Sequence, residues 1–153
     1  ELNLPVVVST QNAYNLLNRS YEQGLSEVTR FENVPLLAYS PLAFGHLTGK
    51  YLDGAQPEGA RLALYPKFGQ RYEKPNVIAA SKAYTQVATD LGVSPATLAI
   101  AFVCSRWFVA SNIIGATKLG QLKENIEAAT FVIPETVLEE IDKIHLKYTN
   151  PAV

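Results

Sequence analysis

The stretch from Pro35 to Tyr51 reads PLLAYSPLAFGHLTGKY, and it begins with a predicted β-strand. Pro35 to Tyr39 is a short apolar run bounded by turn residues, which is typical of a strand buried on both faces of a parallel sheet. Pro41 ends this strand, because proline has no amide hydrogen for the ladder and disfavours helical conformation at the preceding residue. The stretch therefore predicts one strand of an α/β protein.

The loop after this strand has the composition of a phosphate-binding cradle. Leu42 to Lys50 reads LAFGHLTGK, which combines two glycines, a hydroxyl and a cation. Glycines let backbone amides approach an anion closely. The alternative is an ordinary strand-to-helix loop in which the glycines only turn the chain. A nucleoside-triphosphate P-loop is excluded, because Phe44 replaces its first glycine and Tyr51 replaces its metal-binding hydroxyl.

Composition and charge limit the possible classes of protein. The 153 residues are 48% hydrophobic and 18% charged, which suits one globular domain with its own core. With 13 basic and 14 acidic side chains, the chain has no electrostatic footprint for nucleic acid or an anionic membrane. A signal peptide and an apolar run of about 18 residues are both missing, so we expect a cytoplasmic protein. The single cysteine, Cys104, and the two histidines exclude an internal disulfide and a soft-metal cluster.

The start of the chain indicates a piece of a longer protein. The sequence contains no methionine and begins with Glu1. Leu4 to Thr10, LPVVVST, is a second β-branched run that predicts a buried strand, and it arrives after only three residues. Gln11 follows at the carboxyl end of this strand, where parallel α/β sheets place their ligand groups, although a solvated loop residue is the alternative.

The remaining sequence alternates between helical patterns and one further strand. Apolar periodicity predicts that Leu25, Val28 and Phe31 share one face of the first helix, and that Leu122 and Ile126 face inward from a later one. Cys104 and Trp107 are expected in the core. The predicted helices span Ser20 to Phe31, Pro75 to Leu91, Ala96 to Trp107, Gln121 to Ala129 and Pro134 to His145, and the strand spans Ser111 to Ala116.

One long stretch, Leu52 to Lys74, has no regular pattern. It contains Arg61, Lys67, Arg71 and Lys74 among several glycines and prolines. Structureless loops longer than about 12–15 residues are uncommon and are often functional lids or binding loops. A solvated charged face is the alternative, but this stretch begins directly after the predicted phosphate cradle.

Three strands that alternate with helices predict the α/β class with a parallel sheet. An open three-stranded parallel sheet would leave two edges and part of two faces uncovered. A partial (β/α)8 TIM barrel resolves this difficulty, because a complete barrel has eight units and about 250 residues. The sequence therefore predicts three consecutive β/α units of such a barrel, followed by a C-terminal helix.

Three segments together resemble a known family. STQNAYNLLNRS, LLAYSPLAFGHLTGKY and IIGATKLGQLKENI are similar to the last three strand-to-helix junctions of the aldo-keto reductases, in the branch of Tas-type proteins and potassium-channel beta subunits. The resemblance covers essentially the whole chain. It implies an NADPH-dependent oxidoreductase of aldehydes or ketones, of which residues 1–153 would be units 6–8, the C-terminal half that binds NADP(H).

The resemblance implies roles for residues near the nicotinamide and the pyrophosphate. Gln11 would hold the nicotinamide carboxamide, because a side-chain amide offers a donor and an acceptor. Tyr39 would stack on the nicotinamide ring, with a core aromatic as the alternative. Lys50 and Arg61 would add positive charge. The pyrophosphate would be wrapped by Ser40, Pro41, Leu42, Ala43 and Gly45.

The third junction would hold the adenosine end of the cofactor. Gly115 and Thr117 would lie near its phosphate, where unpaired amides at a helix N-terminus favour anions. Glu124 and Asn125 would contact adenine. Many family members carry Lys-Ser at positions 115 and 116 and Arg at position 121, directed to the 2′-phosphate. Here these positions hold Gly115, Ala116 and Gln121, and Lys118 is the cation available to compensate.

No catalytic residue is assigned in this chain. The resemblance places the family's Asp, Tyr, Lys and His on the first four strands, and none of them maps onto residues 1–153. We expect the missing N-terminal half to complete an enzyme for a small carbonyl substrate, and the isolated fragment to be inactive. A non-catalytic nucleotide-sensing or partner-binding module is the alternative.

Overall fold

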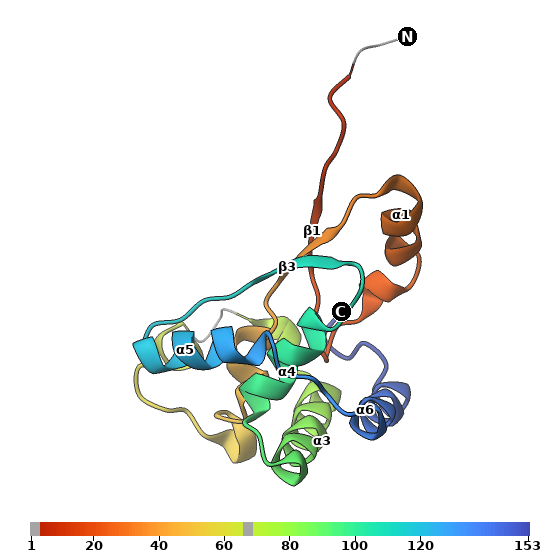
Figure 1. Ribbon diagram of the computed structural model, residues 1–153. Coiled ribbons are helices and arrows are strands. Elements are labelled where there is room, and N and C mark those ends of the chain that lie inside the picture. The colour runs from red at the N-terminus through yellow and green to blue at the C-terminus, as the bar shows by residue number, and fades with distance from the viewer. Residues whose placement is uncertain (1–3, 66–68) are drawn as a thin grey trace.

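The computed structural model describes residues 4–65 and 69–153, and the strands form a three-stranded parallel sheet (Figure 1). The strands are β1 (Thr10–Ala13), β2 (Leu36–Tyr39) and β3 (Val109–Ile113), in the order β1-β2-β3. Both pairings are parallel, as the alternation of strands and helices predicts. This confirms the α/β class.

Six α-helices follow or separate the strands in the described residues. They are α1 (Leu25–Glu32), α2 (Arg61–Leu64), α3 (Pro75–Leu91), α4 (Pro95–Cys104), α5 (Leu119–Ala128) and α6 (Glu135–Lys147). Short 3₁₀ turns occur at η1 (Ser20–Glu22), η2 (Ala43–Thr48), η3 (Leu52–Gly54) and η4 (Gln70–Tyr72). In its described residues, the stretch expected to be irregular holds the short helix α2 and the turns η3 and η4, and its Pro66 and Lys67 lie outside the described residues.

Local signals fix the boundary between α3 and α4. Pro75 opens α3 at its first position, and Gly92 ends it in the left-handed conformation with φ of 76°. The hydroxyl of Ser94 then accepts a hydrogen bond from the amide of Thr97 at 3.0 Å, while Pro95 begins α4. These caps suit the residue types, since only glycine takes positive φ freely and proline needs no amide partner at a helix start. The predicted start and end of α3 and the predicted cap of α4 are confirmed.

The two faces of the sheet differ sharply in burial. Leu36 and Ala38 of β2 are both 0% exposed and pack into the core with side chains of α3, α4 and α6. Because side chains alternate along a strand, Leu37 and Tyr39 point to the opposite face. Tyr39 remains 36% exposed there. The expectation that this strand is buried on both faces is therefore wrong for the described chain, in which helices cover one face only.

Aromatic rings and one buried cation hold the core together. The Tyr14 ring stacks on Phe102 at 6.0 Å between centroids and meets the edge of Phe108 at 5.2 Å. Arg19, nearly buried, donates to Glu22 at 2.8 Å and to Asp142 of α6 at 2.7 Å. Buried ions need such partners, so this network fixes the segment after β1 against the C-terminal helix.

The expected strand from Leu4 to Thr10 is placed wrongly. β1 begins only at Thr10, and residues 4–9 form an extended segment that projects away from the helices (Figure 1). Val6 in this segment is 84% exposed. Its β-branched composition gives it strand propensity, but nothing among the described residues packs on either face or pairs with its backbone. Propensity alone does not make a strand, since pairing and burial supply most of its stability.

Several other sequence expectations need correction. The helix expected from Ser20 to Phe31 is divided into η1 and α1, and its apolar side chains at positions 25, 28 and 31 are exposed. α4 ends at Cys104, which leaves Trp107 outside the helix and 64% exposed. The third strand starts two residues earlier than expected, and Leu122 and Ile126 of α5 are exposed. The apolar periodicity of the sequence identified the apolar faces of these helices correctly. Only some of these faces pack against other segments of the described chain.

No single helix of the described residues is long and apolar enough to cross a membrane. Only α3 and α4 taken together pass that test by length and composition, and they are bent by 96° at their junction.

Candidate functional site

The loop after β2 adopts a backbone that few sequences accept. Ser40, Ala43 and Phe44 all have positive φ, at 58°, 48° and 55°, and Gly45 follows at 102°. The carbonyl oxygen of Ser40 accepts from the amide of Ala43 at 2.9 Å and from the side chain of buried Asn15 at 2.9 Å. Positive φ costs free energy outside glycine, so its presence at Ser40, Ala43 and Phe44 is a feature that the surrounding structure imposes. We call Ser40 to Gly45 the cradle.

Lys50 folds back over the glycine of the cradle. A Cβ atom placed on Gly45 would lie 2.6 Å from Cε and 2.9 Å from Nζ of Lys50. No larger residue fits there without moving the lysine. The missing side chain thus brings a primary ammonium group against the backbone of the cradle, an arrangement that suits a phosphate oxygen. No carboxylate in the described parts of the chain forms a salt bridge with Lys50.

A second cation lies over the neighbouring residue. The guanidinium carbon of Arg61, at the start of α2, is 5.6 Å from the centroid of the Phe44 ring. Cations on aromatic faces are favourable and keep their outer surface free for anions. Lys50 and Arg61 therefore contact two consecutive cradle residues, Gly45 and Phe44.

Aromatic rings connect these two cations beneath the cradle. Phe44 meets Tyr72 of η4 at 5.4 Å between centroids, and Tyr72 lies 5.7 Å from the His46 ring. His46 in turn lies 5.3 Å from Tyr51, whose ring carries the ammonium of Lys50 at 5.0 Å. The sequence did not identify Tyr72 or Tyr51 as part of the site. Their positions depend on contacts between segments that are far apart along the chain.

His46 occupies the centre of this group of rings and is only 9% exposed. Burial lowers its pKa below the ordinary value of 6.5, and the positive charge of Lys50 lowers the pKa further. The imidazole is therefore neutral at pH 7. A neutral ring packs between the two tyrosines without repelling Lys50, so it supports the cradle as an uncharged spacer.

Gln11 and Tyr39, the two residues expected at the nicotinamide, lie on the same face of adjacent strands. The strand register pairs Gln11 with Leu37 and Ala13 with Tyr39, which makes the two side chains diagonal neighbours. Both are exposed. Tyr39 also lines a small cavity of about 170 Å³ with Arg71, a cation that the sequence analysis did not assign to the site.

The residues expected at the adenosine end do not all share one surface. Gln121 accepts from the amide of Thr117 at 3.1 Å, which folds the loop before α5 onto the helix. Gly115 and Lys118 are exposed. By contrast, Glu124 accepts a hydrogen bond from Ser94, and Asn125 is only 4% exposed. None of these residues lines the small cavity beside Tyr39.

The described residues contain no group of three or more His, Cys, Asp or Glu side chains that could hold a metal ion. The chemistry available at the cradle is instead that of two cations, three non-glycine residues with positive φ and an exposed aromatic ring. These groups suit an anionic ligand.

Comparison with known proteins agrees with the fold of this chain. The parallel strands with alternating helices define part of a (β/α)8 barrel, and a solved glycerol dehydrogenase from Gluconobacter oxydans has the same fold, with a TM-score of 0.74 at 23% identity over 95% of this chain and 44% of that one. The profile of the aldo/keto reductase family matches residues 3–146. The chain therefore belongs to the aldo/keto reductase family.

Two relatives indicate which branch of the family this chain resembles. The chain is 51% identical over 149 residues to the protein Tas of Escherichia coli, covering 97% of this chain and 43% of that protein. It is 38% identical to a probable voltage-gated potassium channel subunit beta of Oryza sativa, covering 94% of this chain and 44% of the relative. The resemblance to this branch is confirmed. The chain spans less than half the length of these relatives.

Proposed function

We propose that this chain is the cofactor-binding part of an NADPH-dependent reductase of aldehydes or ketones. The observation that carries the proposal is the cradle, in which Lys50 lies against Gly45 and Arg61 lies over Phe44. Phe44 and Gly45 are adjacent and both have positive φ, and each contacts one cation. Such a pair of cations suits the two phosphates of a dinucleotide. Membership of an oxidoreductase family supports the same reading.

The bound cofactor would supply the hydride for carbonyl reduction. The residues of this chain would bind and orient it. Lys50 would contact the pyrophosphate beside the cradle, where the amides of Ala43 and Gly45 already donate to the carbonyl oxygens of Ser40 and Leu42. Tyr39 offers its exposed ring to one face of the nicotinamide, and Gln11 on the adjacent strand offers the matching amide to the carboxamide.

The preference for NADPH rests on the loop before α5. Lys118 is exposed at the N-terminus of this helix, where a 2′-phosphate would gain from its charge and from unpaired amides. Thr117 and Gln121 already bond to each other, so they define the shape of this loop. Asn125 is nearly buried, so adenine would contact it by reaching below the surface of α5, beside Glu124 and Ser94.

We further propose that the chain forms units 6–8 of its barrel, and that an N-terminal half supplies the catalytic residues. Among the described strands β1 pairs with β2 alone, so its other edge is open to a further parallel strand. The uncovered face that carries Gln11 and Tyr39 would then point to the barrel interior. The whole protein would be cytoplasmic and would need both halves to reduce a small carbonyl substrate. Residues 1–153 alone would be inactive.

A second candidate function is nucleotide sensing without catalysis. The observation that favours it is the similarity to potassium channel beta subunits. The same cradle would bind the dinucleotide, and a partner protein would read the bound state. The presence or absence of carbonyl-dependent NADPH oxidation separates the two candidates.

The test joins this chain to the portion of E. coli Tas that lies outside the matched 149 residues. NADPH fluorescence then reports cofactor binding, and aldehyde-dependent NADPH oxidation reports turnover. We expect binding and turnover by the joined protein and no turnover by residues 1–153. Lys50→Gln should weaken NADPH binding about tenfold or more, since a hydrogen bond to a charged group contributes about 1.5–3 kcal/mol.

Two further variants complete the test. Tyr39→Ala should weaken NADPH binding about tenfold, in line with aromatic stacking on a planar ring. Lys143→Gln on α6 is the control, because this exposed lysine pairs only with Glu140 of its own helix. A joined protein that unfolds cooperatively but binds no NADPH, or that binds it equally well with Lys50→Gln, contradicts the proposal.

A further inference from the structure

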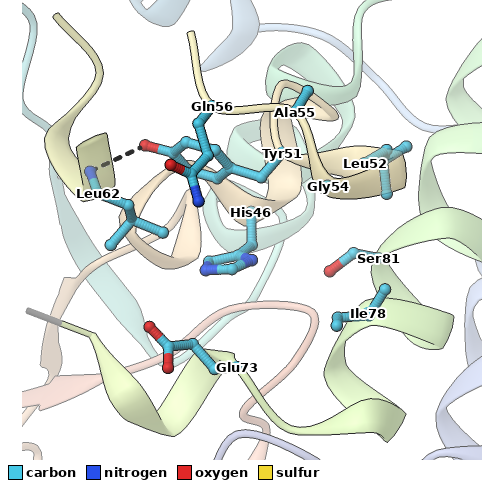
Figure 2. Close-up of a pocket in the computed structure, with 10 residues that line it drawn as sticks. All are labelled: His46, Tyr51, Leu52, Gly54, Ala55, Gln56, Leu62, Glu73, Ile78 and Ser81. Atoms are coloured by element: carbon cyan, nitrogen blue, oxygen red, sulfur yellow. Dashed lines mark hydrogen bonds between the residues drawn. The ribbon is translucent and has the colours of Figure 1, made fainter. Parts of the chain in front are cut away.

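A second cavity lies beside the cradle and shares His46 and Tyr51 with the rings that support it. It encloses about 280 Å³ between the turn after β2, the following loop and the start of α3 (Figure 2). His46 and Tyr51 form one wall, Leu52 and Gln56 come from the loop, and Ile78 and Ser81 come from α3. Ligand sites in proteins usually enclose about 300–1,000 Å³, so this cavity suits a small molecule.

Two deeply buried polar atoms in this cavity have no hydrogen-bond partner among the described residues. They are Nε2 of His46 and Oγ of Ser81, whose residues are 9% and 2% exposed. A buried polar atom that lacks a partner costs free energy, and native proteins rarely leave one unpaired. Two such atoms in one cavity therefore point to an occupant that bonds with both.

The residues that line the cavity favour an uncharged occupant. A neutral imidazole has one donor and one acceptor, and the hydroxyl of Ser81 can do either. The residues that line the cavity include the carboxylate of Glu73 and no lysine or arginine, so an anion would meet repulsion without compensation. Glu73 is exposed, which lets water screen its attraction for a cation.

The lining also limits the shape of the occupant. Leu52 and Ile78 lie beside Ser81, and Leu62 lies on the other side of His46, so apolar and polar groups alternate around the cavity (Figure 2). A molecule with adjacent hydroxyl groups on a short carbon chain matches this mixed lining. Each hydroxyl both donates and accepts, and the carbon atoms cover the apolar side chains.

We propose that this cavity is a binding site for a small neutral polyol, separate from the dinucleotide cradle. The two hydroxyl groups bond to Nε2 of His46 and Oγ of Ser81, and the carbon chain packs on Ile78 and the leucines. This site needs no bound cofactor. Its test is therefore independent of the proposed function.

The experiment uses residues 1–153 without nucleotide and follows the ring signals of His46 by NMR. The probe is propane-1,2-diol, with propionate as its anionic counterpart and 1-aminopropan-2-ol as its cationic one. We expect saturable shifts with the diol at about millimolar concentration, which is reasonable for so few atoms. We expect no saturable shifts with the two charged probes.

Two variants assign the binding to the polar pair. Ser81→Ala should weaken diol binding about tenfold, through the loss of one hydrogen bond. His46→Phe should abolish it while keeping a ring between Tyr51 and Tyr72. Thr89→Ala is the control on the same helix, because the exposed Thr89 hydroxyl bonds only to the carbonyl oxygen of Thr85. Thermal unfolding of each variant verifies that it folds.

Three results would overturn the proposal. The first is a diol titration that stays linear without saturation, which would leave a cavity that holds only water. The second is binding of propionate or 1-aminopropan-2-ol as tight as that of the diol. The third is unchanged diol affinity in folded Ser81→Ala.

Discussion

The two faces of the sheet are built from the same three strands but have opposite environments. On one face Leu36 and Ala38 are covered by α3, α4 and α6 and are fully buried. On the other face Gln11 and Tyr39 are exposed, and the apolar residues that precede β1 have no partner among the described residues. The first face carries the stability of this chain, whereas the second carries the groups proposed for function.

The sharpest test of this contrast compares two phenylalanines. Phe102 is fully buried between the Tyr14 ring and the guanidinium of Arg106, which lies 4.2 Å from its centroid. Phe102→Ala should lower the free energy of unfolding by about 3–5 kcal/mol, because it leaves a cavity in the core. Phe31→Ala on the exposed face of α1 should change it by less than about 0.5 kcal/mol. Urea denaturation followed by circular dichroism measures both, and equal losses would break the contrast.

The next effect concerns the buried ion network on the covered face. Burial by itself raises the pKa of Glu22, but the hydrogen bonds from Arg19 and Tyr14 outweigh burial, so the pKa lies below its ordinary value of 4.5. A lowered pKa in the folded state means that this carboxylate stabilises the fold above pH 4.5, and that the contribution is lost as the pH falls through the folded-state value.

Glu22→Gln should therefore lower the free energy of unfolding by about 2 kcal/mol at pH 7, and by progressively less as the pH falls below 4.5. Urea denaturation at several pH values measures the loss. Glu140→Gln is the matched control, since Glu140 pairs with Lys143 on the exposed surface of α6. A loss that does not depend on pH would assign the effect to packing rather than to charge.

The cradle offers a test of the functional side. Gly45→Ala should cost about 1–2 kcal/mol in stability, because alanine is strained at φ of 102° and its Cβ collides with Lys50. Gly24→Ala provides the comparison, since Gly24 has φ of 106° and nothing within 4 Å of the added atom. Both changes should lower stability, but only Gly45→Ala should weaken binding of inorganic pyrophosphate, measured by calorimetry. Equal pyrophosphate affinity in the two variants would remove Lys50 from the site.

The smallest expected effect comes from His46. Its lowered pKa means that the folded protein holds a neutral ring, so this residue contributes stability above pH 6.5 that is lost as the pH falls through the folded-state value. When the pH is lowered from 7.5 to 5, the free energy of unfolding should fall less in His46→Phe than in the parent chain. We expect the difference between the two decreases to be about 1 kcal/mol or less. His145 also has a pKa lowered by burial, so some pH dependence should persist in the variant. Identical pH profiles would contradict the buried neutral ring.

The sequence predicted best those features that depend on a few adjacent residues. Gly92, Ser94 and Pro95 fix the boundary between α3 and α4 through their own backbone preferences, and the structure agrees. Burial was predicted less well. Val6 and Trp107 have the composition of core residues, but their exposure depends on which distant segments pack against them.

The candidate site divides in the same way. The glycine and the cations of the cradle were visible in the sequence as residue types. The positive φ of Ser40, Ala43 and Phe44 was not, because none of these residue types favours that conformation. The rings that join those cations were not, since Tyr72 reaches His46 from another loop. The buried pair of His46 and Ser81 likewise arises only when α3 packs against the turn after β2.

The most direct measurement of the central claim is an NMR titration of residues 1–153 with NADPH and, separately, with inorganic pyrophosphate. All residues of the cradle and both of its cations are present in this chain, so weak binding should be detectable without further segments. The account predicts that both ligands shift the amide signals of Ala43 to Gly45 most strongly, together with the side-chain signals of Lys50 and Arg61. Shifts centred elsewhere, or none at saturating ligand, would contradict it.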